Sequence, residues 1–160
     1  MRRVATVGAV WLAVSLAVAA RDNKEPAKNE PTDDEKAVVE FTNKERMKEK
    51  LPALKINPVL TSVARAHSEN MAKTGMFDHV LDGKNPADRL KAAGYRCLLC
   101  GENISLGEGG FSPAEVVKGW MDSKLHKANI LHPKFTEIGV GIARNGKGET
   151  YYTQVFALPR

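Results

Sequence analysis

The residues best suited to chemistry gather in one stretch, Cys97 to Ile104, which holds two cysteines, a carboxylate and an amide within eight residues. His79 precedes this stretch and His126 follows it. Imidazole and carboxylate groups are the side chains that most often transfer protons or bind divalent cations. Glu102 and the two histidines are therefore the first candidates for a functional site.

A metal site is one hypothesis for these three residues. Two imidazoles and a carboxylate are suitable ligands for Zn²⁺ or another divalent cation, and an open fourth position would resemble a hydrolytic site. His79, Glu102 and His126 nevertheless come from three separate segments, without the close spacing of a His-Glu-x-x-His helix. The sequence favours the alternative, a hydrogen-bonded cluster of histidine and glutamate that links loops.

An acid–base pair is a second hypothesis, because a proton could pass between Glu102 and His79. A hydrolase or protease of this kind would also need a nucleophile. Ser68, Ser105 and Ser123 are available, but none lies in a Gly-x-Ser-x-Gly elbow or another local signature. These residues thus support a turnover enzyme less than they support a binding site.

Cys97 and Cys100 form a Cys-x-x-Cys motif that could have several roles. A thioredoxin-like redox site would open a helix after a strand, whereas Gly101-Glu102-Asn103 follows here. Haem attachment needs a histidine where Gly101 stands, and a zinc knuckle needs a second ligand pair. We expect a short-range disulfide or a pair of structural thiols.

The N-terminus has the pattern of a secretory signal peptide over residues 1–20. An Arg-Arg pair precedes an apolar run from Val4 to Val18, and small residues allow cleavage after Ala20. The alternative is a retained anchor, but the run is shorter than the ~20 residues of a membrane-spanning helix. Residues 21–32 are charged and contain two prolines, so we expect a disordered linker there.

Composition limits the partners of the mature domain, which we place at residues 33–160. Removing Arg2 and Arg3 with the signal peptide takes the formal net charge from +5 to +3. Lysine and arginine are interspersed with aspartate and glutamate, so no basic patch indicates nucleic-acid binding. We expect a secreted protein, extracellular or periplasmic, with no transmembrane segment after cleavage and in a compartment where disulfides persist.

Helix signals fill the first part of this domain. They predict helices over residues 33–50, 57–75, 85–94 and from 112 onward, three of which start with Asn-Pro or Ser-Pro. His67 lies on the apolar face of the second helix, where we expect a buried ring with a hydrogen-bond partner. Ser123 and His126 share one face of the fourth helix if that helix continues. His79 falls in a loop between two helices.

Strand signals follow in the C-terminal part. Ile138, Val140 and Ile142 alternate with small residues, and residues 151–156 alternate on a returning strand. Asn145-Gly146 between them is a hairpin signal. Because helices precede strands instead of alternating with them, the pattern favours the α+β class over a doubly wound sheet.

Together these residues resemble the CAP superfamily, also called the SCP domain. Its members include cysteine-rich secretory proteins, insect venom antigen-five proteins, plant pathogenesis-related proteins and many bacterial secreted proteins. The resemblance covers about Ala37 to Leu158, and its ordered landmarks are specific as a set. They are Asn43 with Arg46, His67-Ser68 with Met71, Phe77-Asp78-His79 with Pro86 and Arg89, Gly101-Glu102-Asn103-Ile104, Trp120 with Ser123, His126 and Asn129-Ile130-Leu131, Ile138-Gly139-Val140-Gly141, and Tyr152-Thr153-Gln154-Val155.

The resemblance implies a three-layer α-β-α sandwich with a cleft on one side. In eukaryotic members two histidines and two glutamates line this cleft. His79 matches the first histidine and Glu102 the first glutamate, while Ser123 and Tyr151 stand at the other two positions. His126, one helical turn past Ser123, is typical of the bacterial relatives and could reach the same cleft.

We therefore expect a secreted CAP/SCP protein that acts as a non-enzymatic binding or interaction module. His79, Glu102, His126, Tyr151 and Ser123 would line a cleft for a small polar ligand or a divalent cation such as Zn²⁺. The partner would be a small ligand, a lipid or a component of the cell envelope. Two alternatives stay open: a metal-dependent hydrolase acting on peptide or cell-wall material, and a structural surface protein.

Overall fold

The computed structural model describes residues 30–160. The predicted signal peptide, and all but the end of the predicted linker, lie outside this range. Within it, Thr32 is the N-cap of the first helix, α1 (Asp33–Lys48). Thr32 and Glu35 bond reciprocally through side chain and backbone, which satisfies two of the free N–H groups at the start of α1.

Four strands form one mixed sheet in the order β1-β3-β4-β2. They are β1 (Lys55–Ile56), β2 (Cys97–Glu108), β3 (Glu137–Arg144) and β4 (Glu149–Pro159). β3 and β4 form the antiparallel hairpin predicted around Asn145-Gly146, and β1 adds a short parallel edge. β2 runs antiparallel to β4, and in this register Glu102 lies opposite Val155.

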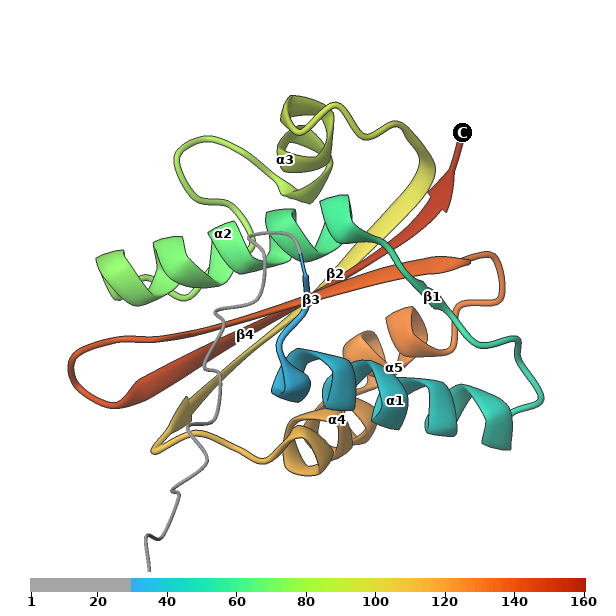
Figure 1. The fold of residues 1–160 in the computed structure, drawn as a ribbon, viewed down its shortest axis with the longest axis horizontal. Coiled ribbons are helices and arrows are strands. Elements are labelled where there is room, and N and C mark those ends of the chain that lie inside the picture. Colours follow the sequence, from blue (N-terminus) through green and yellow to red (C-terminus); the bar gives the residue numbers. More distant parts are fainter. Residues whose placement is uncertain (1–29) are drawn as a thin grey trace, which may run out of the picture.

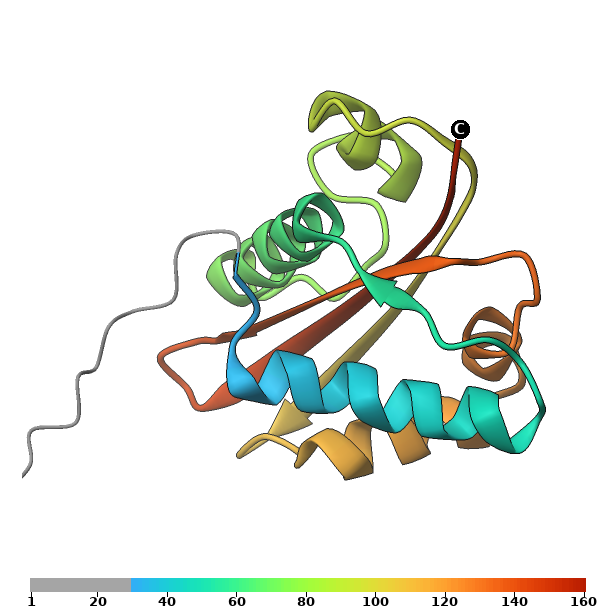
Figure 2. The same cartoon turned by 45° about the vertical axis from the view of Figure 1, so that its right-hand side comes forward.

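Helices cover both faces of this sheet, which confirms the three-layer α-β-α architecture (Figure 1). On one face lie α2 (Pro58–Thr74) and α3 (Pro86–Ala92). On the other lie α1, α4 (Pro113–Asp122) and α5 (Lys124–Ile130), and Figure 2 shows the same separation from a second direction.

The two faces have separate cores, and β4 supplies side chains to both. Tyr152 and Phe156 pack on the side of α1 and α4, together with Trp120. Tyr151 and Val155 alternate with them and pack on the side of α2. This period of two is the alternation that the sequence of residues 151–156 predicts.

Two glycines of β3 let α2 approach the sheet at the closest possible distance. A Cβ atom added to Gly139 would overlap the backbone of Leu60 and Thr61, and one added to Gly141 would overlap the backbone of Ala64 and Arg65. Only residues without a Cβ are compatible with this contact between backbones. The position of α2, and of every side chain that it carries, therefore depends on these two glycines.

Arg46, at the end of α1, is buried without a carboxylate partner among the described residues. Its guanidinium donates to four carbonyl oxygens, those of Pro52, Ile130, His132 and Phe135, at 2.9, 2.8, 3.0 and 3.3 Å. Burial lowers the pKa of Arg46. The side chain thereby links the loop after α1 to the end of α5 and to the segment that leads into β3.

The fourth predicted helix is not continuous, which corrects the expectation for Ser123 and His126. Ser123 has an extended backbone (φ −97°, ψ 123°) and separates α4 from α5. The break redirects the chain so that α5 packs against β2, where Asn129 donates to the side chain of Asn103 at 2.8 Å.

No helix within residues 30–160 combines the length and the apolar character that crossing a membrane would require.

The contact between α2 and β3 yields a stability prediction. Gly141→Ala should lower the free energy of unfolding by about 3 kcal/mol, at the upper end of overpacking effects, because backbone cannot yield as a side chain can. Urea unfolding followed by circular dichroism measures the loss. Gly146→Ala is the matched control, since a Cβ there meets nothing within 4 Å. Equal unfolding midpoints for the two variants would contradict the prediction.

Candidate functional site

Glu102 is the centre of a buried charged cluster. Its side chain is 1% exposed, and both carboxylate oxygens are paired. Oε1 lies 2.8 Å from His79 Nδ1, and Oε2 accepts a hydrogen bond from Arg89 Nη2 at 2.6 Å. The contact to Oε1 assigns a proton to Nδ1 of His79, so that Nε2 of this 45%-exposed side chain is available to another partner.

Strand alternation sends the two polar residues of the Gly-Glu-Asn segment to opposite faces of β2. Glu102 points to the side of α2 and α3, and Asn103 points to the side of α5. Asn103 Nδ2 donates to Gln154 Oε1 and to the His126 carbonyl, both at 3.1 Å. Asn129 donates to the Glu102 carbonyl at 3.1 Å as well as to Asn103. Hydrogen bonds therefore hold this part of β2 from both faces.

Arg89, on α3, is the charge partner that the sequence analysis did not assign to the site. Besides its bond to Glu102, its Nη1 donates to the carbonyls of His79 and Lys84, both at 2.9 Å. A buried carboxylate is costly without such a cation. Arg89 thus neutralises Glu102 and also fixes the loop that carries His79. The sequence signal for it was its place among the family landmarks.

His67, on α2, lies beside the same carboxylate, with Nε2 3.8 Å from Oε1 of Glu102. Its burial is confirmed, but within residues 30–160 neither ring nitrogen has a hydrogen-bond partner at standard geometry, although the backbone of Asp78 lies near the ring. The distance of 3.8 Å from Nε2 to Oε1 is too long for a hydrogen bond. Burial lowers the pKa of His67, although the negative charge of Glu102 and the nearby backbone of Asp78 oppose this shift.

His126 and Ser123 line a surface hollow of about 610 Å³ next to Phe77 and Trp120. Most of its wall is apolar. The pKa of His126 is lowered by burial and then by the electrostatic influence of the neighbouring His79. The two histidines are therefore within electrostatic reach of each other, although the structure shows no hydrogen bond between the His126 ring and the described residues around Glu102.

Tyr151 does not line this hollow. It is 1% exposed and packs with Met71, Leu81 and Ile104 in the core on the α2 side. Its hydroxyl group donates to Glu149 at 3.3 Å. Of the five predicted cleft residues, the structure thus joins His79 to Glu102, places His126 and Ser123 in the hollow, and puts Tyr151 in the core.

The cluster around Glu102 is poorly suited to a divalent cation as it stands. Both carboxylate oxygens already have partners, and one of these partners is the positively charged Arg89. Within residues 30–160, no group of three or more His, Cys, Asp or Glu side chains is arranged to hold a metal ion. Metal binding by His79, Glu102 and His126 stays a prediction, and it would require Arg89 to move.

Cys97 and Cys100 are free thiols brought to the same face by a β-bulge. The bulge lies between Cys97 and Leu99, so the partners of the two cysteines on β4, Pro159 and Ala157, are two residues apart. Burial, and then the neighbouring Cys97, raises the pKa of Cys100 to about 11. The disulfide stays a prediction.

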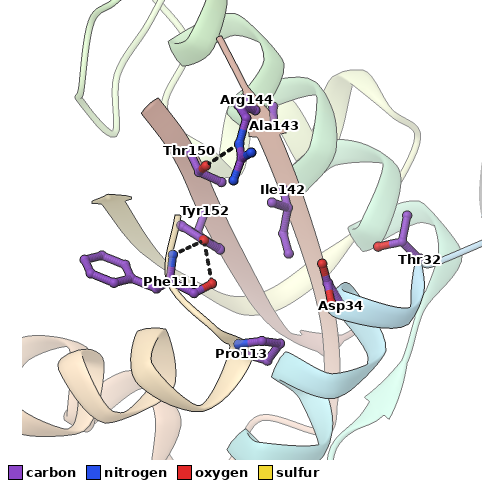
Figure 3. Close-up of a pocket in the computed structure, with 9 residues that line it drawn as sticks. All are labelled: Thr32, Asp34, Phe111, Pro113, Ile142, Ala143, Arg144, Thr150 and Tyr152. Atoms are coloured by element: carbon purple, nitrogen blue, oxygen red, sulfur yellow. Dashed lines mark hydrogen bonds between the residues drawn. The ribbon is translucent and has the colours of Figure 1, made fainter. Parts of the chain in front are cut away.

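A separate pocket of about 460 Å³ lies against the start of α1 and the β3–β4 hairpin (Figure 3), and none of the five predicted residues lines it. The Tyr152 hydroxyl accepts from the Phe111 N–H at 2.7 Å and donates to the Phe111 carbonyl at 2.9 Å. Arg144 donates to the Gly109 carbonyl at 3.1 Å. These bonds fix the glycine-rich segment 107–110 and position Phe111, which also lines the hollow.

Comparison with known proteins gives a consistent result. Residues 39–156 match the model of the CAP family, described as the cysteine-rich secretory protein family. The uncharacterized protein YkwD of Bacillus subtilis is 44% identical over 123 residues, which are 76% of this chain and 46% of YkwD. This chain therefore spans less than half the length of that curated relative.

Solved structures have the same fold. An extracellular protein of Bacillus anthracis containing an SCP domain is 30% identical, with a TM-score of 0.68 over 78% of this chain and 40% of that one. An outer surface protein of Borrelia burgdorferi is 21% identical, with a TM-score of 0.75 over 82% of this chain and 96% of that one.

The pairing of Glu102 with Arg89 can be tested by a double-mutant cycle. Glu102→Gln should lower the free energy of unfolding by about 2–3 kcal/mol, because it leaves a buried guanidinium without its counter-charge. Adding Arg89→Gln should recover part of this loss in chemical denaturation. Glu45→Gln is the control, since Glu45 forms only a surface pair with Lys48, worth less than about 1 kcal/mol. A coupling energy near zero would refute the pairing.

The burial of His67 predicts a pH dependence of stability. Because its pKa is lowered by folding, the unfolded chain takes up the proton first as the pH falls below about 6.5. Stability that is present near neutral pH is therefore lost on acidification. His67→Phe removes this contribution, so unfolding free energy should vary less between about pH 7 and pH 5. Parallel curves for the variant and the wild type, measured by urea unfolding, would contradict the prediction.

Proposed function

The chain belongs to the CAP family of cysteine-rich secretory proteins, and we propose that it is an extracellular, non-enzymatic binding module of the bacterial type. Its ligand is a small molecule whose polar group meets His79 and whose apolar part occupies the hollow beside Phe77 and Trp120. One observation carries this proposal: Glu102 uses both oxygens on His79 and Arg89, while His79 keeps one ring nitrogen free.

The hydrogen bonding supports binding over turnover. A carboxylate that orients a histidine can prepare it as a base, but acyl or glycosyl transfer also needs a nucleophile within reach of that base. Within residues 30–160 the hydroxyl of Ser68 bonds to Gly141 and Thr153, and no serine hydroxyl bonds to a histidine ring. The free nitrogen of His79 is thus better suited to hold a ligand than to activate an attacking group.

The residues that line the hollow support the proposal that part of the ligand is apolar. Phe77, Leu106 and Phe111 line it and are 47, 37 and 42% exposed, an unusual density of exposed large apolar side chains. Phe111 is held by the two backbone bonds to Tyr152, so this wall is formed before any ligand arrives. A concave apolar surface with a few polar groups at its margin is the usual form of a small-molecule site.

Two observations support an extracellular location. The relatives with this fold include proteins described as extracellular and as outer surface proteins. Residues 1–20 also have the pattern of a secretory signal peptide. A lipid or a component of the cell envelope would meet the protein there, and either can offer a polar head with an apolar chain.

Fluorescence tests the proposal, because Trp120 is the one tryptophan within residues 30–160 and lies in the wall of the hollow. Octanoate and 1-octanol, as charged and neutral probes, should change its emission saturably. His79→Ala and Phe77→Ser should each weaken binding at least about tenfold, the effect of about 1.4 kcal/mol. Leu125→Ser, an exposed apolar residue outside the hollow, is the control.

A saturable response to neither probe, or one unchanged in both variants, would overturn the proposal. Zinc titration by calorimetry decides the metal-dependent alternative. Zinc binding that His79→Ala/His126→Ala abolishes would replace the proposed function by a metal site, and a hydrolysis screen would then follow. If zinc does not bind, the proposal of a binding module rests on the octanoate and 1-octanol titrations alone.

A further inference from the structure

A pocket of about 370 Å³ lies beside α3, at the end of the sheet where β2 begins and β4 ends (Figure 1). Three of the residues that line it are basic, and the others are neutral: Lys91, Arg96 and Arg160, with Ala87, Tyr95 and Cys97. This basic pocket shares no lining residue with the hollow beside Phe77 and Trp120, so it is a separate site.

The charged side chains in the wall of the basic pocket all have the same sign. Four other hollows formed by residues 30–160 each include an acidic side chain, namely Asp34, Asp82, Glu115 or Glu69. Even where the terminal carboxylate of Arg160 is counted, positive groups outnumber negative ones in the basic pocket. A concave surface lined by one sign of charge concentrates the electric field and attracts ions of the opposite sign.

The three cations of the basic pocket have no counter-charge of their own. Within residues 30–160, Lys91, Arg96 and Arg160 form no ion pair with a carboxylate side chain, whereas Arg65 and Arg89 each bind a buried one. All three side chains are also exposed, so a ligand from solvent can reach them.

Two carboxylates adjoin this end of the domain, but neither lines the basic pocket, and both already accept other hydrogen bonds. Asp88, on α3, accepts from the Asn85 N–H at 3.2 Å. Glu137 accepts from the Tyr95 hydroxyl at 2.5 Å and from the Asn57 side chain at 2.8 Å. The bond to Glu137 also fixes Tyr95, whose side chain forms part of the wall.

The backbone places the three cations near one another. The Arg160 N–H donates to the Arg96 carbonyl at 3.1 Å, beside the first residue pair of β2 and β4. Gly94, with a positive φ of 75°, closes the turn after α3, and its N–H donates to the Lys91 carbonyl at 3.0 Å. Like charges on neighbouring segments repel each other. An anion between them would therefore relieve a repulsion that the fold itself creates.

We propose that the basic pocket is a second binding site, which takes the phosphate group of a small anion. Phosphate has more oxygens and up to twice the charge of a carboxylate, so it can contact several cations at once. An arginine guanidinium matches phosphate with two parallel hydrogen bonds, and a lysine supplies a point charge. The volume of about 370 Å³ exceeds the ~30 Å³ share of one water molecule more than tenfold, so a phosphate group fits with several waters.

Nuclear magnetic resonance on the whole protein tests this site. Inorganic phosphate and monomeric dihexanoyl phosphatidylglycerol are the probes. Sodium acetate at matched ionic strength and dihexanoylglycerol, which lacks the phosphate, are the controls. Binding should shift the backbone amide resonances of Lys91, Arg96 and Arg160 saturably. Saturation by only one of the two probes identifies the source of the phosphate, a lipid headgroup or a free phosphate.

Charge-removing variants locate the binding. Lys91→Gln, Arg96→Gln and Arg160→Gln should each weaken phosphate binding at least about threefold, because each removes a charge-assisted hydrogen bond. Lys124→Gln, exposed on α5 outside the basic pocket, removes the same charge and should leave the affinity unchanged. The response of Trp120 to 1-octanol should be unchanged in the triple variant, so failure of this site and failure of the hollow can be distinguished.

Equal shifts with acetate would overturn the proposal, because they would reduce the effect to ionic strength. Absence of a saturable shift with both phosphate probes would do the same. Unchanged phosphate affinity in the triple variant would place the binding elsewhere on the protein, and an equal loss in Lys124→Gln would attribute it to net charge alone. Either result would refute the assignment.

Discussion

The close approach of α2 to β3 is the contact on which the geometry of the site depends. Gly139 and Gly141 remove the side chains that would otherwise separate helix and sheet, so the backbones meet directly. This contact places His67 beside Glu102, and it places Ser68 where its hydroxyl donates to the Gly141 carbonyl at 2.9 Å. A side chain at either glycine would push the helix away from the sheet and from the carboxylate.

The buried carboxylate of Glu102 is the shared hydrogen-bond and charge partner of the side chains around it. Glu102 has two oxygens, and His79 and Arg89 take one each. His67 approaches the same carboxylate from α2, but its Nε2 lies 3.8 Å from Oε1, beyond hydrogen-bond distance. The result is a buried charged cluster that leaves Nε2 of the partly exposed His79 side chain available to another partner.

The parts of this structure that follow local chemistry were predictable from sequence, and the parts that join distant segments were not. Asn57, Asn85 and Ser112 cap their helices as expected, because capping involves residues only two or three positions apart. The sequence did not predict β2, because Gly101 and the bulge near Leu98 interrupt its alternation of apolar and polar residues. The family resemblance located His79 and Glu102, but the approach of both His67 and His79 to one carboxylate oxygen arises only when three separate segments meet.

Arg46 has a consequence for the order in which the chain can fold. Three of its four carbonyl acceptors lie 84, 86 and 89 residues farther along the chain, so the end of α1 cannot satisfy its buried charge until α5 and the start of β3 are present. Contacts so distant in sequence form slowly. An incomplete chain that ends before α5 therefore leaves the Arg46 guanidinium without three of its four acceptors, so the buried position of this side chain is available only to the complete domain.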